Sequence, residues 1–516
     1  MKLTILSTSD THGYVLPTDY MRRDQDLPFS LAKAKTVIDQ VKATADEVLT
    51  VENGDWLQGS PLAYYAARVH PDPAQLTAGY TAVGYDLGIL GNHEFNYGSE
   101  YLQQAISGLN YPILCANILR AGQPAFGRPY ELVKRGGVTI AVLGLTTDYI
   151  PHWEGQQNIA GLTFVPALAA AKDWVPRLRA LADVVVVCYH GGFERDLITG
   201  EPTEALTGEN VGYALTQVPG IDALVTGHQH RELAGVVNGV PVTQPGYRGT
   251  NVGRIDLTLT PTLAGWQVTA KHATLVPTGA APAADAVTAA VADPAAKVED
   301  WLDSPLGRVT GDMTIHDAFA ARVVESPYIE FINRVQMAAT GTDISGTALF
   351  NNDGRGFGQV ITMRDVVTNY IYPNTLAVVR LSGADLKAAL EQSAEYFALT
   401  ADGHLGISPR FLDPKPQHYN YDMYEGIDYQ IDVTQPVGQR ITALTYHGQP
   451  VTAAQSYDVA VNQYRAGGGG DFRMFDHSKI IRENQKDMTE LIADYLQAHP
   501  VLPGMANHNF TVLPKM

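Results

Sequence analysis

The chain has 516 residues and a formal net charge of −18 at pH 7, with 45% hydrophobic and 17% charged residues. This composition excludes the disordered and fibrous classes, and the length exceeds what one hydrophobic core usually serves, so we expect two domains. The acidic balance, 36 Lys and Arg against 54 Asp and Glu, disfavours polymeric nucleic acid and anionic membrane surfaces as partners. A small phosphorylated substrate remains compatible with it, because bound cations reverse the local field.

The sequence shows neither a secretory leader nor an apolar run long enough for a membrane span. We therefore expect a cytoplasmic protein, or a periplasmic or extracellular one if a leader has been removed. The two cysteines, Cys115 and Cys188, lie in apolar runs and predict buried free thiols. Nothing in the sequence predicts the oligomeric state.

Apolar runs alternate with amphipathic segments through the first half of the chain. The predicted strands are 3–6, 48–51, 86–90, 138–145, 184–189, 223–226, 240–244 and 254–259, and the predicted helices are 30–44, 64–69, 75–83 and 167–182. This alternation is typical of a layered α/β domain.

The composition changes near Gly279, where Ala, Pro and Asp become frequent. We predict a first domain over 1–285, a partly helical linker over 286–312 and a smaller mixed α/β domain over 313–516. In the second domain, the predicted helices are 329–340, 383–397 and 487–497, and the predicted strands are 376–381, 430–433, 443–446 and 459–462.

Five polar clusters each follow an apolar run that predicts a strand. They are Asp10-Thr11-His12, Gly54-Asp55, Gly91-Asn92-His93-Glu94, His190-Gly191-Gly192 and Gly227-His228-Gln229-His230. Open α/β sheets bind their ligands at the carboxyl ends of strands. Each cluster alone is a weak signal, but all five in the same setting predict one shared site.

The chemistry of these clusters predicts a metal site. The candidate ligands are two carboxylates, one amide oxygen and four imidazoles: Asp10, His12, Asp55, Asn92, His190, His228 and His230. One ion takes about four to six donors, so two ions bridged by Asp55 account for the surplus. Imidazole and oxygen donors without thiolate favour manganese, iron, cobalt or zinc, of which we favour manganese. Two such ions hold a hydroxide that attacks phosphorus in line with the leaving oxygen of a phosphate ester.

In order and spacing, the five clusters resemble the signature of the calcineurin-like metallophosphoesterases. The resemblance implies a layered αββα sandwich followed by a smaller mixed α/β substrate-binding domain. It also implies two ligand sets that share Asp55: Asp10, His12, Asp55 and His230 for one ion, and Asp55, Asn92, His190 and His228 for the other. His93 would not bind metal but would stabilise the transition state or protonate the leaving oxygen. Glu94 we interpret as a structural hydrogen-bonding group.

Within that family, the chain resembles the bacterial 5′-nucleotidase and cyclic phosphodiesterase group over nearly its whole length. The 5′-nucleotidase branch has aspartate three residues after the catalytic histidine, whereas this chain has Asn96. An amide orients an imidazole but cannot balance the charge of an imidazolium ion, so His93 should be a weaker cation. His230 also stands where 5′-nucleotidases commonly have glutamine. Asn96 resembles the 2′,3′-cyclic-nucleotide 2′-phosphodiesterase/3′-nucleotidase branch.

The second domain resembles the same branch in the segments YIYPNT at 370–375, NYD at 420–422 and NQYRAG at 462–467. By this resemblance Tyr372 and Tyr464 would sandwich the nucleobase, and such stacking contributes about 1–3 kcal/mol per base. Asn374 and Asp471 are candidates for bonds to the base or ribose, and Arg355 for the phosphate or ribose. The alternatives are two ordinary core tyrosines and an exposed loop arginine without a role.

The sequence therefore predicts a hydrolase of small nucleotides. Its reaction would open 2′,3′-cyclic nucleotides to 3′-nucleotides and then release phosphate from the 3′-nucleotides. One alternative on the same scaffold is a 5′-nucleotidase or a pyrophosphatase of nucleotide sugars or dinucleotides. The other is a non-catalytic nucleotide-binding protein with a structural metal site, which the complete set of donors argues against.

Overall fold

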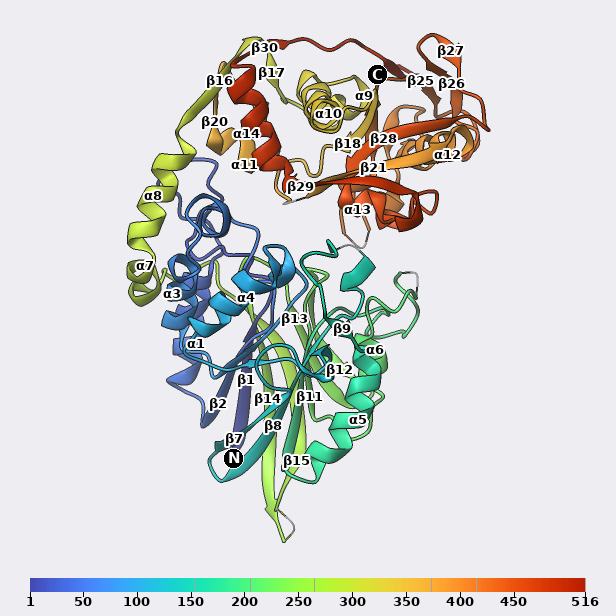
Figure 1. Cartoon of the computed structure of the whole chain (residues 1–516). Helices are drawn as coiled ribbons and strands as arrows, with labels where there is room; N and C mark the ends of the chain where they lie inside the picture. Colours follow the sequence, from blue (N-terminus) through green and yellow to red (C-terminus); the bar gives the residue numbers. More distant parts are fainter. Residues whose placement is uncertain (153, 205, 264, 373, 414, 516) are drawn as a thin grey trace. The chain divides into compact units, whose positions relative to one another are not determined.

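The computed structural model describes the chain except residues 153, 205, 264, 373, 414 and 516, and it divides into two compact units, Met1–Glu299 and Asp300–Met516 (Figure 1). The stretch that the sequence analysis assigned to a partly helical linker carries helices α7 (Asp285–Ala290) and α8 (Ala292–Leu302), and strand β16 (Pro305–Gly311) follows them. Each unit is a mixed α/β structure with its own sheets.

The first unit is built on two six-stranded sheets. One has the order β15-β14-β1-β2-β3-β4 and the other β12-β13-β11-β10-β8-β7. Their bounds are β1 (Lys2–Thr8), β2 (Glu47–Glu52), β3 (Leu87–Ile89), β4 (Ile113–Leu114), β14 (Asn251–Thr262) and β15 (Gly265–Pro277) in the first sheet, and β7 (Tyr130–Arg135), β8 (Val138–Thr146), β10 (Val184–His190), β11 (Ala223–Val225), β12 (Glu232–Val237) and β13 (Val240–Pro245) in the second. All eight strands predicted for this unit are confirmed.

Strand β10 shows why continuous apolar runs are needed here. Its residues alternate between the two faces of the sheet, as in any strand. Val184, Val186 and Cys188 lie in the core shared with apolar residues of the other sheet, whereas Val185 and Val187 lie in the core under helix α5 (Ala167–Arg179). Both faces of this strand are therefore buried, and the run from Val184 to Cys188 is apolar throughout.

Helices complete the αββα layering of this unit. In Figure 1, α5 and α6 (Gly212–Leu215) cover one sheet, while α1 (Leu31–Lys42), α3 (Ala74–Val83) and α7 lie on the side of the other. The Ser30 side chain caps α1 by accepting the Lys33 N–H, and α3 ends at Gly84, whose φ is +74°. The shorter elements are α2 (Pro61–Tyr64), the π-helix η1 (Tyr65–Val69), α4 (Gly98–Ser107), β5 (Ile118–Arg120), β6 (Gln123–Pro124) and β9 (Thr163–Phe164).

The second unit has a central five-stranded sheet of order β24-β18-β28-β21-β29. The strands of this unit are β16, β17 (Met313–Thr314), β18 (Ile344–Ala348), β19 (Gly356–Phe357), β20 (Val360–Thr362), β21 (Thr375–Ser382), β22 (Phe397–Leu399), β23 (Leu405–Ile407), β24 (Asp422–Glu425), β25 (Asp428–Asp432), β26 (Ile441–Tyr446), β27 (Gln449–Pro450), β28 (Ser456–Asn462), β29 (Ile480–Asp487), β30 (Val501–Gly504) and β31 (Phe510–Leu513). Its helices are α9 (Ala320–Val323), α10 (Pro327–Thr340), α11 (Met363–Asn369), α12 (Gly383–Ala394), α13 (Gln463–Ala466) and α14 (Met488–Ala498). The three helices and four strands predicted for this unit are confirmed. Capping boxes begin α11, α12 and α14.

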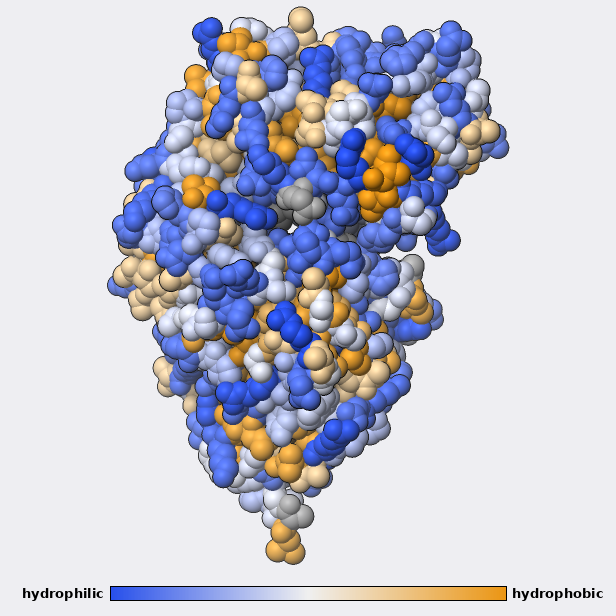
Figure 2. All heavy atoms as spheres, viewed as in Figure 1, coloured by the Kyte–Doolittle hydropathy of each residue, from blue (hydrophilic) through white to orange (hydrophobic). Residues whose placement is uncertain are grey.

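Hydrophilic residues cover most of the face shown in Figure 2, and hydrophobic residues are scattered over it in small groups. Such scattering is usual for a folded chain whose apolar side chains are mostly internal. None of the helices in the described part of the chain is both long enough and apolar enough to span a bilayer.

Candidate metal centre

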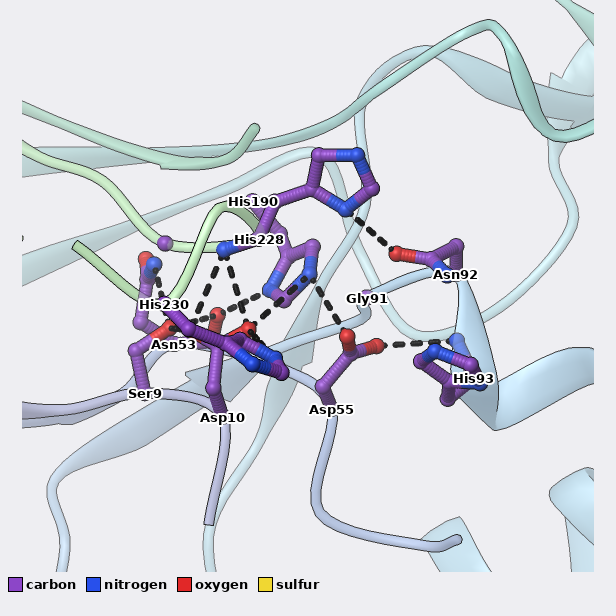
Figure 3. A network of polar contacts seen from close by, with 12 residues as sticks. Ser9, Asp10, Asn53, Asp55, Gly91, Asn92, His93, His190, His228 and His230 are labelled. Carbon is purple, nitrogen blue, oxygen red and sulfur yellow. Dashed lines mark hydrogen bonds and ion pairs between the residues drawn. The ribbon is translucent and has the colours of Figure 1, made fainter. Parts of the chain in front are cut away.

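The five polar clusters meet at the carboxyl ends of parallel strands in the first unit. Strands β1, β2 and β3 run parallel in one sheet, and β8, β10 and β11 run parallel in the other. Two hydrogen bonds join these ends across the sandwich: the Thr146 hydroxyl donates to the Leu90 carbonyl, and His190 Nδ1–H donates to the Asn53 carbonyl, at 2.7 Å in both cases. The strand ends of both sheets thus form one platform for the side chains labelled in Figure 3.

Five of the seven candidate ligands have a left-handed backbone. The values of φ are +55° at Asp10, +51° at His12, +57° at Asp55, +73° at His228 and +58° at His230. Residues with a Cβ rarely adopt this conformation, which costs about 1–3 kcal/mol each at strained sites. The surrounding contacts stabilise five such residues at one place. This clustering is typical of a functional centre and not of a set of solvated loops.

Hydrogen bonds outside the cluster fix which ring nitrogen of three histidines faces inward. His12 Nδ1–H donates to the Gln58 carbonyl at 2.9 Å, and His228 Nε2–H donates to the Glu209 carboxylate at 2.9 Å. His190 is oriented in the same way by Asn53. A metal-binding histidine characteristically donates its other N–H to a carbonyl or carboxylate in this manner. The remaining nitrogen of each ring therefore faces the cluster.

The inward atoms form two groups that each have the spacing of a metal site. Oxygen and nitrogen atoms of Asp10, His12 and His230 lie within 4.8 Å of one another, and so do those of Asp55, His190 and His228. Figure 3 shows Asp55 between His190 and His93. Its Oδ2 lies 3.1 Å from His190 Nε2 and 4.0 Å from His12 Nε2, so this carboxylate adjoins both groups.

Asn92 also contacts the second group, through His228. Asn92 Oδ1 lies 2.8 Å from His228 Nδ1, while Glu209 lies against Nε2 on the far side of the same ring. An amide oxygen and an imidazole nitrogen that converge in this way can bind one cation. The donor set, four imidazoles and three oxygen ligands in two groups, fits two divalent ions of the transition-metal class.

Burial sets the proton affinities of these groups. It raises the pKa of Asp10 to about 7, although His190 opposes the shift, and it lowers the pKa of His12 to about 4. For His190 burial also acts to lower the pKa, but the Asp55 and Asp10 carboxylates outweigh it and raise the value to about 10. For Asp55 burial acts to raise the pKa, and His190 outweighs it, so that the pKa lies well below its usual range. The cluster therefore holds negative charge that needs protons or cations.

Glu94 holds the loop that carries Asp55. Its two carboxylate oxygens accept the backbone N–H groups of Asp55, Trp56, Leu57 and Gly91 at 2.5–3.0 Å. The interpretation of Glu94 as a structural hydrogen-bonding group is therefore confirmed. Gly91 is required beside it, because a Cβ at this position would lie 2.2 Å from Asp55 Oδ1.

His93 belongs to a chain of hydrogen bonds that leads away from the cluster. Its Nδ1–H donates to Asn96 Oδ1 at 2.7 Å, and Asn96 Nδ2 donates to Glu154 Oε2 at 2.7 Å. Glu154 Oε1 accepts from Asn158 Nδ2 and from the Gly155 N–H, both at 2.8 Å. Asn96 thus orients His93, as predicted. The Glu154 carboxylate in turn accepts a hydrogen bond from Asn96.

Sequence reasoning missed Glu154 and Glu209. Glu154 lies in the segment between η3 (Ile150–His152) and β9, and Glu209 lies in the loop between β10 and α6, so neither comes directly after a strand of the platform. No local pattern links Glu154 to Asn96, which is 58 residues away, or Glu209 to His228, which is 19 residues away.

The structure places the five candidate substrate-binding residues in the second unit. Tyr372 is half-buried, with its ring edge-on to Phe350 at a centroid distance of 5.2 Å, and Tyr464 lies 6.3 Å from Tyr419. Arg355 and Asp471 are exposed on loops, and Asn374 is half-buried just before β21. Pro373, between Tyr372 and Asn374, lies outside the described residues. Neither tyrosine is a fully buried core residue.

Arg465 holds the loop that carries Tyr464 and Asp471. Its guanidinium is 2% exposed and pairs with the Asp422 carboxylate at 2.6 Å, while also donating to the Gly469 carbonyl and to the Tyr419 carbonyl at 3.1 Å. It lies 3.6 Å from the centroid of the Phe472 ring. One buried arginine thus fixes the glycine-rich turn beside Tyr464 from three directions.

Two family models match the chain, one per unit: calcineurin-like phosphoesterase over residues 3–232 and 5′-nucleotidase, C-terminal domain, over residues 305–477. A 2′,3′-cyclic-nucleotide 2′-phosphodiesterase/3′-nucleotidase of Salmonella typhimurium is 31% identical over 99% of this chain and 89% of its own length. The chain belongs to this family of two-domain nucleotide phosphoesterases. It is accordingly a hydrolase whose family uses divalent metals, and its first unit has the calcineurin-like fold.

Two further relatives agree with this membership. The phosphoesterase is 40% identical to a Staphylococcus aureus protein assigned as a 5′-nucleotidase and solved with alpha-ketoglutarate, with a TM-score of 0.91 over 99% of this chain and 100% of that one. It is 28% identical to the trifunctional nucleotide phosphoesterase protein YfkN of Bacillus subtilis over 99% of this chain, but it spans only 39% of that longer protein.

Proposed function

We propose that this phosphoesterase hydrolyses 2′,3′-cyclic nucleotides to 3′-nucleotides, and 3′-nucleotides to nucleoside and phosphate. The observation that carries the reaction class is the pair of donor groups within 4.8 Å spacing, joined through Asp55. The choice of substrate rests on Asn96 behind His93 and on relatives named for this activity, which are 29–31% identical and of which the chain covers 86–89%.

In this proposal Asp10, His12, Asp55 and His230 bind one ion, and Asp55, Asn92, His190 and His228 bind the other. Imidazoles and hard oxygens without a thiolate favour manganese among the divalent metals. When bound, the ion pair activates water at neutral pH and neutralises the charge of the phosphoryl group. Gln58, Asn53 and Glu209 keep the histidine rings oriented for this task.

His93 acts on the leaving group. Its Nδ1–H is donated to Asn96, so Nε2 is the atom that holds the proton transferred to the leaving oxygen. For the cyclic substrate that oxygen is the ribose 2′-oxygen, and for the 3′-nucleotide it is the 3′-oxygen. The same proton donor serves both steps, because the two oxygens lie on adjacent ribose carbons.

The second unit supplies recognition of the nucleoside. Tyr372 and Tyr464 stack on the two faces of the base, which tolerates any base because every base offers a π-face. Asn374 and Asp471 bond the base or ribose edges, and Arg355 binds the phosphate or ribose. The half-buried state of both tyrosines and the exposure of Arg355 support this assignment.

A 5′-nucleotidase is the second candidate, supported by the 40% identical protein assigned as one. The test is a side-by-side assay of 2′,3′-cyclic AMP, 3′-AMP, 5′-AMP and ADP with added Mn²⁺. We expect the highest kcat/KM for the cyclic substrate and for 3′-AMP. Preference for 5′-AMP or ADP would reject the proposal in favour of a 5′-nucleotidase or pyrophosphatase, and no hydrolysis of any of them would reject both.

The division of labour is tested by two variants. Tyr372→Ala should mainly raise KM, by about tenfold for a stacking contribution of about 1–3 kcal/mol. Asp55→Ala should abolish turnover at any substrate concentration. Equal damage to kcat from both variants would contradict the assignment of Tyr372 to base binding.

A further inference from the structure

Three glutamates of the second unit that have no role in the sites described above converge on one another. Glu325 follows α9, Glu330 lies in the first turn of α10, and Glu425 ends β24. One carboxylate oxygen of each lies within 4.8 Å of the others. All three side chains are buried, with residue exposures of 6%, 1% and 7%.

The hydrogen bonds to these carboxylates come from a segment that precedes β31. The Asn507 N–H donates to Glu330 Oε2 at 2.8 Å, and the Asn507 side-chain amide donates to Glu425 Oε1 at 2.6 Å. The backbone N–H groups of His508 and Asn509 lie near Glu325. Asn507 therefore partners one oxygen of Glu330 and one of Glu425, and Arg334 pairs with the other oxygen of Glu330.

Two buried oxygens have no hydrogen-bond partner: Glu325 Oε2 and Glu425 Oε2. Arg334 forms an ion pair with Glu330, and among the described residues neither Glu325 nor Glu425 has an ion pair. A buried carboxylate that lacks a partner is costly. The cluster consequently needs positive charge, as a cation or as a proton shared between carboxyl groups.

We propose that Glu325, Glu330 and Glu425 bind a divalent cation of the calcium class, which ties α10, β24 and the segment 507–509 together. The donors are all carboxylate oxygens, which hard cations prefer, and no imidazole or thiolate belongs to the group. Oxygens bound to one Ca²⁺ at about 2.3–2.6 Å can lie up to roughly 5 Å apart, which accommodates the observed spacing. Octahedral Mg²⁺, at about 2.0–2.1 Å, requires a tighter cluster.

The competing occupant is a proton. Burial, followed by the neighbouring Glu330 and Glu425, raises the pKa of Glu325 to about 7. A protonated Glu325 would donate to Glu425 and satisfy both unpartnered oxygens without any metal. The two occupants differ in their response to added calcium, which makes them distinguishable.

The test uses the full chain stripped with chelator, with ⁴⁵Ca²⁺ binding and Tm as readouts. Wild type should bind one equivalent of Ca²⁺ that the double variant Glu325→Gln/Glu425→Gln lacks. At a calcium concentration roughly 100 times Kd, Tm of the second unit should rise by about 5 °C or more in wild type only. The control Asp413→Asn/Asp428→Asn removes two exposed carboxylates of the same unit and should behave as wild type.

A second arm does not depend on the folding of the glutamine variant. Asp55→Ala, which is altered in the phosphoesterase centre, should still bind this calcium and gain the same Tm. Equal calcium binding by wild type and the double glutamine variant would overturn the proposal. So would a wild type whose Tm does not change with added calcium, because that result assigns a shared proton to the cluster.

Discussion

The Nε2 atoms of His12 and His230 face each other at 3.0 Å. His12 cannot supply a proton to this contact, because its Nδ1–H is donated to Gln58 and burial lowers its pKa to about 4. His230 is held in place from its other side by Tyr247, whose ring stacks on it at a centroid distance of 5.0 Å. Two ring nitrogens that converge in this way can bind one cation.

Asp55→Ala should remove both ions together. Asp55 adjoins both donor groups, through His190 at 3.1 Å and His12 at 4.0 Å, so neither group keeps its full set without it. Elemental analysis after dialysis against Mn²⁺ should fall from about two ions per chain to fewer than one, with loss of turnover. Asp39→Ala, which removes an exposed carboxylate of α1, is the control. Retention of two ions by the Asp55 variant would contradict the bridging role.

Glu154→Gln should lower kcat while leaving KM and metal content nearly unchanged. A glutamine has one acceptor oxygen, and it cannot receive Asn96 on one side and Asn158 with Gly155 on the other. The Asn96 amide would then lose its orientation toward His93, at a cost of roughly tenfold out of the 10²–10⁴ that a general acid contributes. Steady-state kinetics with the exposed-site control Glu100→Gln measures this effect. A variant with raised KM and unchanged kcat would speak against a positioning role.

Gly91→Ala should damage the centre far more than the same change at Gly235. A Cβ at Gly91 meets Asp55 Oδ1 at 2.2 Å and the Asp55 N–H nitrogen at 2.6 Å, whereas a Cβ at Gly235 has only an ordinary contact at 3.6 Å. Displacing a catalytic group by about 1 Å costs roughly 100-fold in rate. We expect that loss, with weakened metal binding, for Gly91→Ala and near wild-type activity for Gly235→Ala. Similar activity of both variants would refute the crowding argument.

Arg465→Gln should destabilise the second unit strongly. It leaves Asp422 buried without its partner, which costs about 3–5 kcal/mol, and removes the bonds that hold the turn beside Tyr464. Arg380→Gln breaks an exposed ion pair with Asp458 and should change stability little, because solvent screens such a pair. Thermal unfolding should therefore separate the two variants by roughly 10 °C. Equal Tm values would show that the buried pair contributes little.

The sequence predicted structure best where a local feature, such as a buried strand or a helix cap, requires a particular type of residue. The apolar run of β10 predicts a strand because both of its faces are buried, and the five polar clusters together predicted the strand ends at which the site lies. The start of α1 was predictable to within one residue, since Ser30 caps it.

What could not be predicted depends on distant contacts. Glu209 and Glu154 contact residues that are distant in sequence and that only the fold brings close. No local sequence pattern predicts either contact. The same holds for Glu325, Glu330 and Glu425, which lie on three separate elements. The left-handed φ at Asp10 and at His228 could not be predicted from the sequence either, because aspartate and histidine do not require this conformation.

Strand β14 lies between β15 and β1 in its sheet, yet it is made after every candidate ligand, from Asp10 to His230. During synthesis on the ribosome, β1 therefore lacks one neighbour until residue 262 has emerged. A nascent chain that carries all seven donors still has an open sheet edge beneath the first of them. A fragment that ends before β14 would therefore carry all seven donors without the strand that flanks β1.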